Sequence, residues 1–317
     1  MTALRKGGPD LALGDGRGQV TLAAAQDGAK TAELIDGLGR IHQGRFDAKA
    51  GAPLVLDREE ALGYLGYAGQ SVDVALQSRF DRLADACEQG TAPAFAWAAF
   101  SVDEDKTLWD AQGAQSGGAA SDGLPPSAPP SQGARSRPPA EGGSQPQVAL
   151  AGCGLVLPGR DIARHLRGAK AVALMACTLG MVNERELRKH NAMSPTDGMM
   201  YGAASSALVE AAANAVEASI VAWAADRGLH TNWRYSPGYG DLPLSVQPAF
   251  LRSLDATRRI GLSLTPSWLL VPTKSVTAVV GLFDRPQAGA EVRTGCKGCQ
   301  LRTACQLRKR GRTCHHG

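Results

Sequence analysis

Residues 234–243 read RYSPGYGDLP and combine one arginine, two prolines, two glycines and two tyrosines. Pro237 fixes its own φ angle and Gly238 tolerates a positive φ angle, so the pair predicts a tight turn. The planar, permanently charged fork of Arg234 suits a carboxylate. A tyrosine ring beside it can stack on a flat ring or lie over a cation. The stretch is therefore either a ligand-binding turn or an ordinary Pro-Gly connection between a helix and a strand.

The clearest helical pattern of the chain lies just before this turn, over residues 194–228. Ser194 is the expected N-cap, Pro195 suits the first helical position, and Gly228 ends the pattern. One face carries only small side chains, namely Gly202, Ala203, Ser206 and Ala213. A flat face lets another backbone element come close, so we expect this helix to be central.

Shorter patterns surround this helix. They predict helices within 56–70, 73–90 and 159–169, and strands within 94–102, 148–157, 171–178 and 269–282. Cys87, Cys153 and Cys177 lie inside apolar stretches, and we interpret them as packing residues. Lys274 and Ser275 belong to the last strand, where they lie either near a ligand or, as we favour, at a solvated strand edge.

The composition sets limits on the protein class. Only 5% of the 317 residues are aromatic, so a core must be built mainly from Ala, Val and Leu. No run reaches the roughly 18 apolar residues of a membrane span, and the N-terminal residues lack the apolar core of a secretory signal. We therefore expect a cytoplasmic protein without a membrane partner, whose seven cysteines do not form structural disulfides.

Changes in composition divide the chain. Residues 1–50 predict a weakly structured N-terminal extension, and 112–147 are a Pro/Gly/Ser-rich stretch that cannot bury enough surface to order itself. We interpret this stretch as a disordered insertion within one domain made of 51–111 and 148–290. An interdomain linker is the alternative. Residues 291–317 form a separate, cysteine-rich basic tail.

The turn at 234–243 resembles the Arg-x-x-Pro-Gly-Tyr motif of the activation domain of cobalamin-dependent methionine synthase. Further segments resemble short, free-standing members of that family in the same order: EALGYLGYAGQ, DIARHLRGAKAVALMACTLG and LSLTPSWLLVPTKSVTAVVGL. The likeness covers about 56–111 and 148–284. It departs from the full-length enzyme after Tyr239, where Gly240 and Asp241 replace the Tyr-Pro-x-Cys-Pro continuation.

The resemblance implies an α+β fold with a mixed or antiparallel sheet and packed helices. It implies that Arg234 binds the methionine carboxylate of S-adenosylmethionine, while Ser236, Gly238 and Tyr239 supply turn backbone and a wall of the site. The acidic residue that the family uses against the ligand's amino group has no clear counterpart in the sequence. These roles require the turn to lie at the surface and the Arg234 guanidinium not to be committed to an internal carboxylate.

In the family this domain rescues inactive cob(II)alamin by reductive methylation, with an electron from a separate donor. No catalytic acid or base is needed, because the domain supplies positioning. The chain lacks the Asp-x-His-x-x-Gly motif that ligates cobalamin. The resemblance therefore implies a corrinoid carried by a partner, either a methionine synthase or another corrinoid protein. The alternative is a non-catalytic scaffold or metal-binding adaptor that keeps the fold without the ligand.

The tail contains a C-x2-C-x5-C-x8-C pattern formed by Cys296, Cys299, Cys305 and Cys314. Four thiolates can close an iron–sulfur or zinc site, and the nearby basic side chains would lower the thiol pKa values. We favour an iron–sulfur cluster over zinc, with a free-thiol or redox pair as the alternative. His315 and His316 are interpreted as exposed terminal residues. Nucleic-acid binding by the basic tail is the weakest hypothesis, because no aromatic platform accompanies it.

Overall fold

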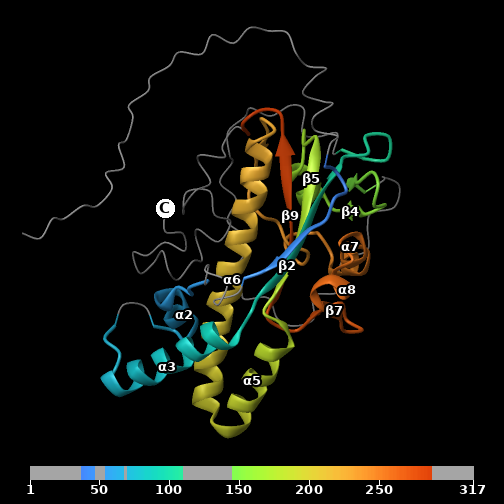
Figure 1. The fold of residues 1–317 in the computed structure, drawn as a ribbon. Helices are drawn as coiled ribbons and strands as arrows, with labels where there is room; N and C mark the ends of the chain where they lie inside the picture. Colours follow the sequence, from blue (N-terminus) through green and yellow to red (C-terminus); the bar gives the residue numbers. More distant parts are fainter. Residues whose placement is uncertain (1–36, 47–53, 68–69, 110–144, 288–317) are drawn as a thin grey trace, which may run out of the picture.

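The computed structural model describes residues 37–46, 54–67, 70–109 and 145–287. Their centre is a five-stranded antiparallel sheet in the order β1-β2-β5-β9-β6 (Figure 1). Its strands are β1 (His42–Arg45), β2 (Ala94–Ser101), β5 (Ala171–Thr178), β9 (Ser275–Phe283) and β6 (His230–Thr231). Helices pack on both faces, so the predicted α+β fold with an antiparallel sheet is confirmed.

Strand β5 shows why the sheet is covered on both sides. All eight of its residues are buried, as expected for an apolar run without polar alternation. Successive side chains of a strand point to opposite faces, and the two faces of β5 join two separate cores. One core receives Ala171, Ala173, Met175 and Cys177, and the other receives Val172, Leu174 and Ala176. Burial raises the pKa of the Cys177 thiol to about 12, in line with a packing role.

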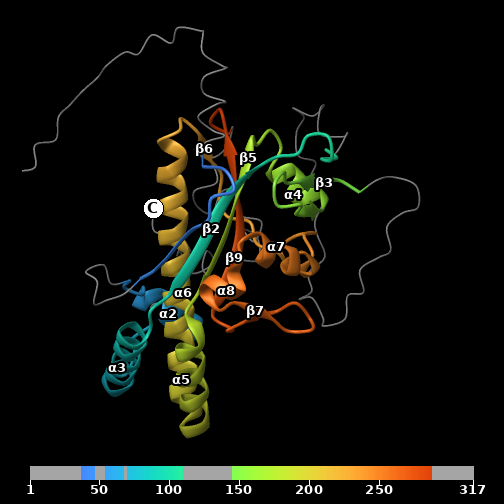
Figure 2. The ribbon, with the colours of Figure 1, turned by 45° about the vertical axis from the view of Figure 1, so that its right-hand side comes forward.

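The first face is covered by α6 (Pro195–Ala225), together with α2 (Arg58–Tyr64), α3 (Val74–Gly90) and α5 (Gly180–Met193). The Ser194 side chain caps α6 by accepting a hydrogen bond from the Asp197 amide, and Pro195 follows it in the first turn. Small residues on α6 let it lie close to β5, so its predicted central position is confirmed. Beyond the end of the sheet, α5 and the first part of α6 run side by side as a helical hairpin (Figure 2).

Helix α6 also bears on the expectation that the chain has no membrane-spanning run. Within the described residues it is the one helix long and apolar enough to cross a bilayer by length and composition. Of its most apolar 18-residue window, 44% is buried inside the molecule. A packed core helix passes the same test, so this finding is weak evidence for a membrane span.

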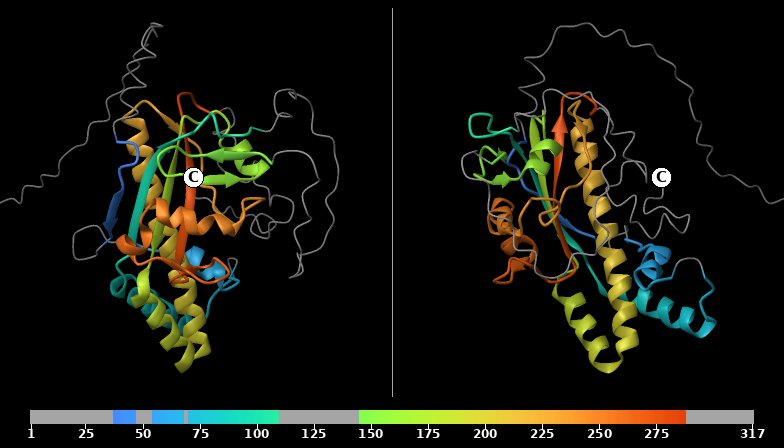
Figure 3. Two further views of the ribbon diagram at one scale, coloured as in Figure 1. Left: turned by 90° about the vertical axis from the view of Figure 1, so that its right-hand side faces the viewer. Right: turned by 180° about the vertical axis from the view of Figure 1, so that it is seen from behind.

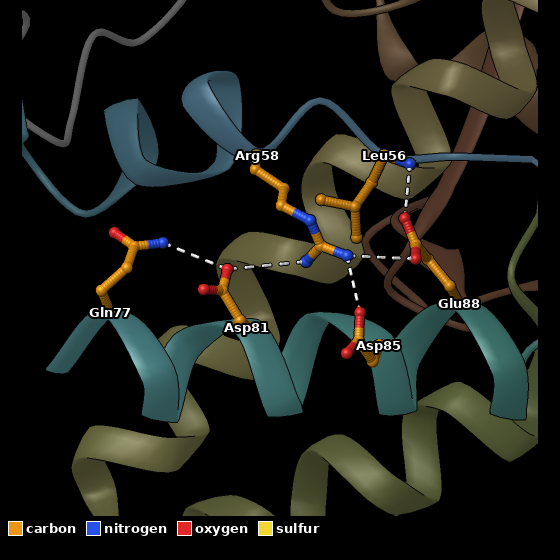
Figure 4. Close-up of polar contacts among 6 residues, drawn as sticks. All are labelled: Leu56, Arg58, Gln77, Asp81, Asp85 and Glu88. Carbon is orange, nitrogen blue, oxygen red and sulfur yellow. Dashed lines mark hydrogen bonds and ion pairs between the residues drawn. The ribbon is translucent and has the colours of Figure 1, made fainter. Parts of the chain in front are cut away.

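An arginine ties α2 to α3. Asp57 and Asp73 cap the two helices with their side chains. Acidic side chains of α3 face Arg58 of α2. Arg58 Nη2 lies 2.7 Å from Asp85 Oδ1 and 3.4 Å from Glu88 Oε2, as Figure 4 shows. Glu88 Oε1 also accepts a hydrogen bond from the amide of Leu56 (2.9 Å). The segment entering α2 is thereby fixed against α3.

The second face is covered by short elements (Figure 3). They are β3 (Gln147–Ala149), β4 (Val156–Pro158), α4 (Arg160–His165), η3 (Leu244–Val246), α7 (Gln247–Ser253), α8 (Ala256–Ile260), β7 (Ser263–Leu264) and β8 (Leu270–Val271). Their apolar side chains, including Leu157, Ile162 and Phe250, form the second core. The layers are therefore helices, sheet and a mixed layer of short helices and hairpins.

Several sequence expectations are corrected. Part of the extension at 1–50 belongs to the sheet, because β1 pairs with β2 and His42 stacks on Trp97 at 4.0 Å. The strand expected over 148–157 is a hairpin of β3 and β4, since Gly152 and Gly154 adopt positive φ angles between them. Cys153 lies in that turn and is only half-buried. Gln147, which we assigned to the insertion, already begins β3.

Two further differences concern helix α5 and the last strand. Helix α5 was not predicted, because its sequence is polar and packs against α6 with few apolar side chains. The run 269–282 is divided into β8 and β9. The segment from Pro272 to Lys274, which turns the chain, separates the two strands. The two pieces 51–111 and 148–290 contribute neighbouring strands, β2 and β5, to one sheet.

Candidate functional site

A cavity of about 510 Å³ lies beside the 234–243 turn. It is lined by α6 on one side, the turn and the start of α7 on another, and the β7–β8 hairpin and the start of β9. The lining side chains include Glu210, Arg234, Ser236, Pro237, Tyr239, Leu244, Gln247, Trp268, Leu269 and Thr277. A larger cavity, of about 620 Å³, lies at the β3–β4 hairpin and has Arg252 as the single charged residue among its described lining.

The cavity opens along an edge of β9. Strand β6 pairs with β9 at Leu282 and Phe283, and Tyr235 continues this edge by exchanging two backbone hydrogen bonds of 2.9 Å with Val279. In an antiparallel strand, every second residue directs its N–H and C=O groups to the same neighbour. The main-chain groups of Thr277 therefore point to the same side as those of Val279, where the cavity lies.

The turn itself lies at the surface, as the hypothesis requires. Gly238 (φ 96°) and Gly240 (φ 52°) adopt angles that favour glycine, and the Gly238 amide donates to the Leu242 carbonyl at 2.8 Å. Tyr239 at its tip is 63% exposed. A Cβ atom on Gly240 would collide with the Tyr235 hydroxyl and the Asp161 carboxylate. The tight turn of the backbone therefore requires glycine at both positions.

Asp241 has a structural role. Its two carboxylate oxygens accept hydrogen bonds from the amides of Arg160 (2.6 Å) and Asp161 (3.0 Å) at the start of α4. It therefore caps a helix that begins 81 residues earlier in the chain. This contact fixes the end of the turn to the second-face layer.

Arg234 is already ion-paired, which contradicts the second requirement. Its Nε lies 2.9 Å from Glu217 Oε2, and its Nη2 lies 2.7 Å from Asn214 Oδ1 and 3.5 Å from Glu210 Oε2. All three acceptors lie on α6, one or two helical turns apart. The expectation of an uncommitted guanidinium was therefore wrong, because α6 presents a row of acceptors that its sequence did not reveal as facing the turn. None of these contacts uses Nη1.

The cavity wall also contains an acidic side chain, that of Glu210. It lines the cavity next to Arg234. Together, Glu210, Glu217 and Arg234 carry a net formal charge of −1. A cluster with this balance attracts a positively charged group more than a negatively charged one.

The aromatic side chains divide into structural and accessible ones. Tyr235 packs against His165 at 5.0 Å and donates its hydroxyl hydrogen bond to the Tyr239 carbonyl. Burial, with Asp161 and Asp241 nearby, raises its pKa to about 12. Tyr239 and Trp268 line the cavity. Trp268 was missed in the sequence, although a tryptophan directly after the turn-forming residues Pro266 and Ser267 was a usable signal.

Hydrogen bonds hold polar residues at the cavity wall and next to it. Gln247 Nε2 donates to Thr277 Oγ1 at 2.8 Å, and both residues are buried. Lys274 is half-buried and donates to Ser206 Oγ of α6 at 2.7 Å. Burial lowers its pKa. The favoured interpretation of Lys274 as a solvated edge residue was therefore wrong, because it crosses to α6.

The four tail cysteines, Cys296, Cys299, Cys305 and Cys314, lie outside the described residues. Within the described ranges, no group of three or more His, Cys, Asp or Glu side chains could hold a metal ion.

Among solved structures, the chain is similar to a crystal structure of the MetH reactivation domain bound to AdoHcy. The two share 13% sequence identity with a TM-score of 0.49, over 78% of this chain and 80% of the other. No protein-family model matches the sequence, and no curated protein matches it.

Proposed function

We propose that the cavity binds S-adenosylmethionine, and that the protein supports reductive methylation of cobalamin carried by a separate methionine synthase or another corrinoid protein. One observation carries the proposal. The Arg-x-x-Pro-Gly-Tyr turn forms the wall of a cavity in which a guanidinium, a carboxylate and accessible aromatic rings meet. Its volume, about 510 Å³, lies in the range of small-molecule sites.

The charges of the site suit the amino-acid end of this ligand. The α-carboxylate would accept from Arg234, through Nη1 or by displacing Glu217, and the α-ammonium would donate to Glu210. The ligand carries two positive groups and one negative group, so its net charge of +1 complements the −1 of the cluster. Tyr239 offers a π face for the sulfonium.

The residues of this chain then act by binding and orientation. When bound, S-adenosylmethionine supplies the methyl group, and an external donor supplies the electron. The ligand would be held at a surface turn, where a corrinoid on another protein can reach it. No side chain has to move a proton, so no catalytic residue is assigned. The proposal places the protein in the cytoplasm, where such partners would be found.

For the cysteine tail we keep the proposal of an iron–sulfur cluster that passes the electron to the corrinoid. Its support is the donor set, four thiolates with basic neighbours. Protein purified without oxygen is then expected to be brown and to contain iron. Colourless protein with stoichiometric zinc would contradict this assignment.

A second candidate function is a scaffold or adaptor that keeps the fold without the ligand. The observation in its favour is the ion pair between Arg234 and Glu217, in which the guanidinium serves the fold. In this case the turn would be a structural connection, and its main contribution to the fold would be the cap that Asp241 makes on α4.

Calorimetry with S-adenosylmethionine distinguishes the two. We expect binding by the natural protein and at least tenfold weaker binding by Arg234→Ala and Glu210→Gln, since each loses a charge-assisted hydrogen bond of about 1.5–3 kcal/mol. Arg79→Ala is the matched control: Arg79 pairs with Asp197 of α6 at 2.7 Å, and neither residue lines the cavity. Absence of binding by the natural protein would select the adaptor.

A further inference from the structure

We propose that Trp268 is the platform on which a purine base stacks, and so the residue that selects an adenosyl ligand. This inference rests on the proposed function, because it assigns a role within the same cavity.

Trp268 is held in an unusual backbone conformation. Its φ angle is 63°, and it shares a positive value with only one other non-glycine residue, Asp255, among the described residues. This region is disfavoured for L-residues, above all for bulky ones. A residue keeps such a conformation, which costs free energy, only where the surrounding structure holds it in place. Such residues are often found at functional sites.

The β7–β8 hairpin maintains it by a set of hydrogen bonds. The Trp268 amide donates to the Thr265 carbonyl and the Thr265 amide donates to the Leu269 carbonyl, both at 2.9 Å. Thr265 Oγ1 accepts from the Leu269 amide at 3.0 Å and contacts the Ser267 hydroxyl at 3.0 Å. These hydrogen bonds fix the turn, so the indole is already positioned before a ligand binds.

The indole is also accessible in the site. It is 44% exposed and lines the cavity. Tyr239, the other lining ring, already packs edge-on against Tyr235 at 6.3 Å. Trp268 makes no ring contact within the described parts of the chain. An exposed indole on the wall of a cavity is suited to stacking on a flat base.

The edge of β9 complements this platform. The main-chain N–H and C=O groups of Thr277 point to the cavity side, and they offer one donor and one acceptor. Adenine presents the matching pair, an amino donor beside a ring-nitrogen acceptor. The class of ligand that satisfies both features is a purine nucleoside with an amino-acid extension toward Glu210 and Arg234.

The test measures binding of S-adenosylmethionine, adenosine and L-methionine separately, by calorimetry and tryptophan fluorescence. For Trp268→Ala we expect about tenfold or greater loss of affinity for S-adenosylmethionine and adenosine, and no change for L-methionine. Trp268→Phe should keep most of the affinity. Trp268→Gly should lose affinity and yet raise the melting temperature, because glycine relieves the φ angle. Adenosine should quench the fluorescence of the natural protein and of the control Trp233→Phe, but not of Trp268→Phe.

The outcomes separate the two proposals. If the natural protein binds S-adenosylmethionine and Trp268→Ala binds it equally well, the platform is refuted and the function stands. If it binds adenosine through Trp268 but not S-adenosylmethionine, the function fails and the platform stands. Binding of none of the three ligands refutes both.

Discussion

Glu217→Gln is the perturbation that decides how Arg234 works. In the structure, Glu217 accepts from Arg234 Nε at 2.9 Å, and the side chains are 25% and 21% exposed. Glu217 does not line the cavity, so the substitution reaches the ligand through Arg234. If the ligand carboxylate has to displace Glu217, the existing pair lowers the apparent affinity of the natural protein.

The size of the effect follows from the contact. Glutamine keeps the shape and a neutral hydrogen bond, whereas the carboxylate makes a charge-assisted bond about twice as strong. The difference is about 1 kcal/mol, which corresponds to about a fivefold increase in affinity for S-adenosylmethionine. The same change should lower the free energy of unfolding by about 0.2–1 kcal/mol, as for other partly exposed pairs.

Calorimetry and denaturant unfolding measure the two quantities side by side. Asp197→Asn is the matched control. Asp197 lies on α6, as Glu217 does, and pairs with Arg79 of α3, but it does not line the cavity. It should leave ligand affinity unchanged. Weaker binding by Glu217→Gln would show that Glu217 orients the guanidinium, and unchanged binding would show that the ligand reaches Nη1 without displacing Glu217. Either result would contradict the reasoning that the two carboxylates compete.

Three further predictions concern the fold. Burial, with Arg40 and Arg227 nearby, lowers the pKa of His42 below 6.5, so the folded state binds this proton less readily than the unfolded chain. Stability should fall as the pH drops from about 7 through the folded pKa, and unfolding of His42→Gln should lack that part of the slope. Asn183 is fully buried, and its Nδ2 lies 3.0 Å from Ser205 Oγ. Asn183→Ala should cost about 2–3 kcal/mol in denaturant unfolding, because buried partners such as Ser205 lose their hydrogen bond, and a cost under about 1 kcal/mol would contradict this reasoning. Asp241→Ala removes the cap of α4 and should cost about 1 kcal/mol. Unchanged thermal stability would show that the cap contributes nothing.

Much of the fold could be predicted from the sequence, namely the parts in which local signals and burial agree. Asp57, Asp73 and Ser194 were usable cap signals, and β5 was a continuous apolar run. Strand β1 could not be predicted, because it is ordered by its pairing with β2 and by the stacking of His42 on Trp97. Both are contacts between distant parts of the chain. Periodicity within a segment carries no information about such partners.

The site could be predicted from the sequence in part. The path of the turn follows from Pro237 and Gly238, which act locally. The ion pairs of Arg234 depend on which face of α6 meets the turn, and that face is set by the packing of α6 on the sheet. Glu210 and Trp268 reach the cavity from segments 24 residues before and 34 residues after Arg234, so no local pattern joins them.

The bridge between Leu108 and Gln147 has a consequence for how this chain can vary. These two residues exchange backbone hydrogen bonds of 2.9 and 3.0 Å, so the start of β3, in the second-face layer, holds Leu108 and Gln147 next to each other. Lengthening a stretch whose ends are already joined adds only about 0.6 kcal/mol of closure entropy per doubling. We therefore expect that this chain tolerates insertions and deletions between the two residues, and that a four-residue link could replace the whole stretch while the rest of the architecture stays intact.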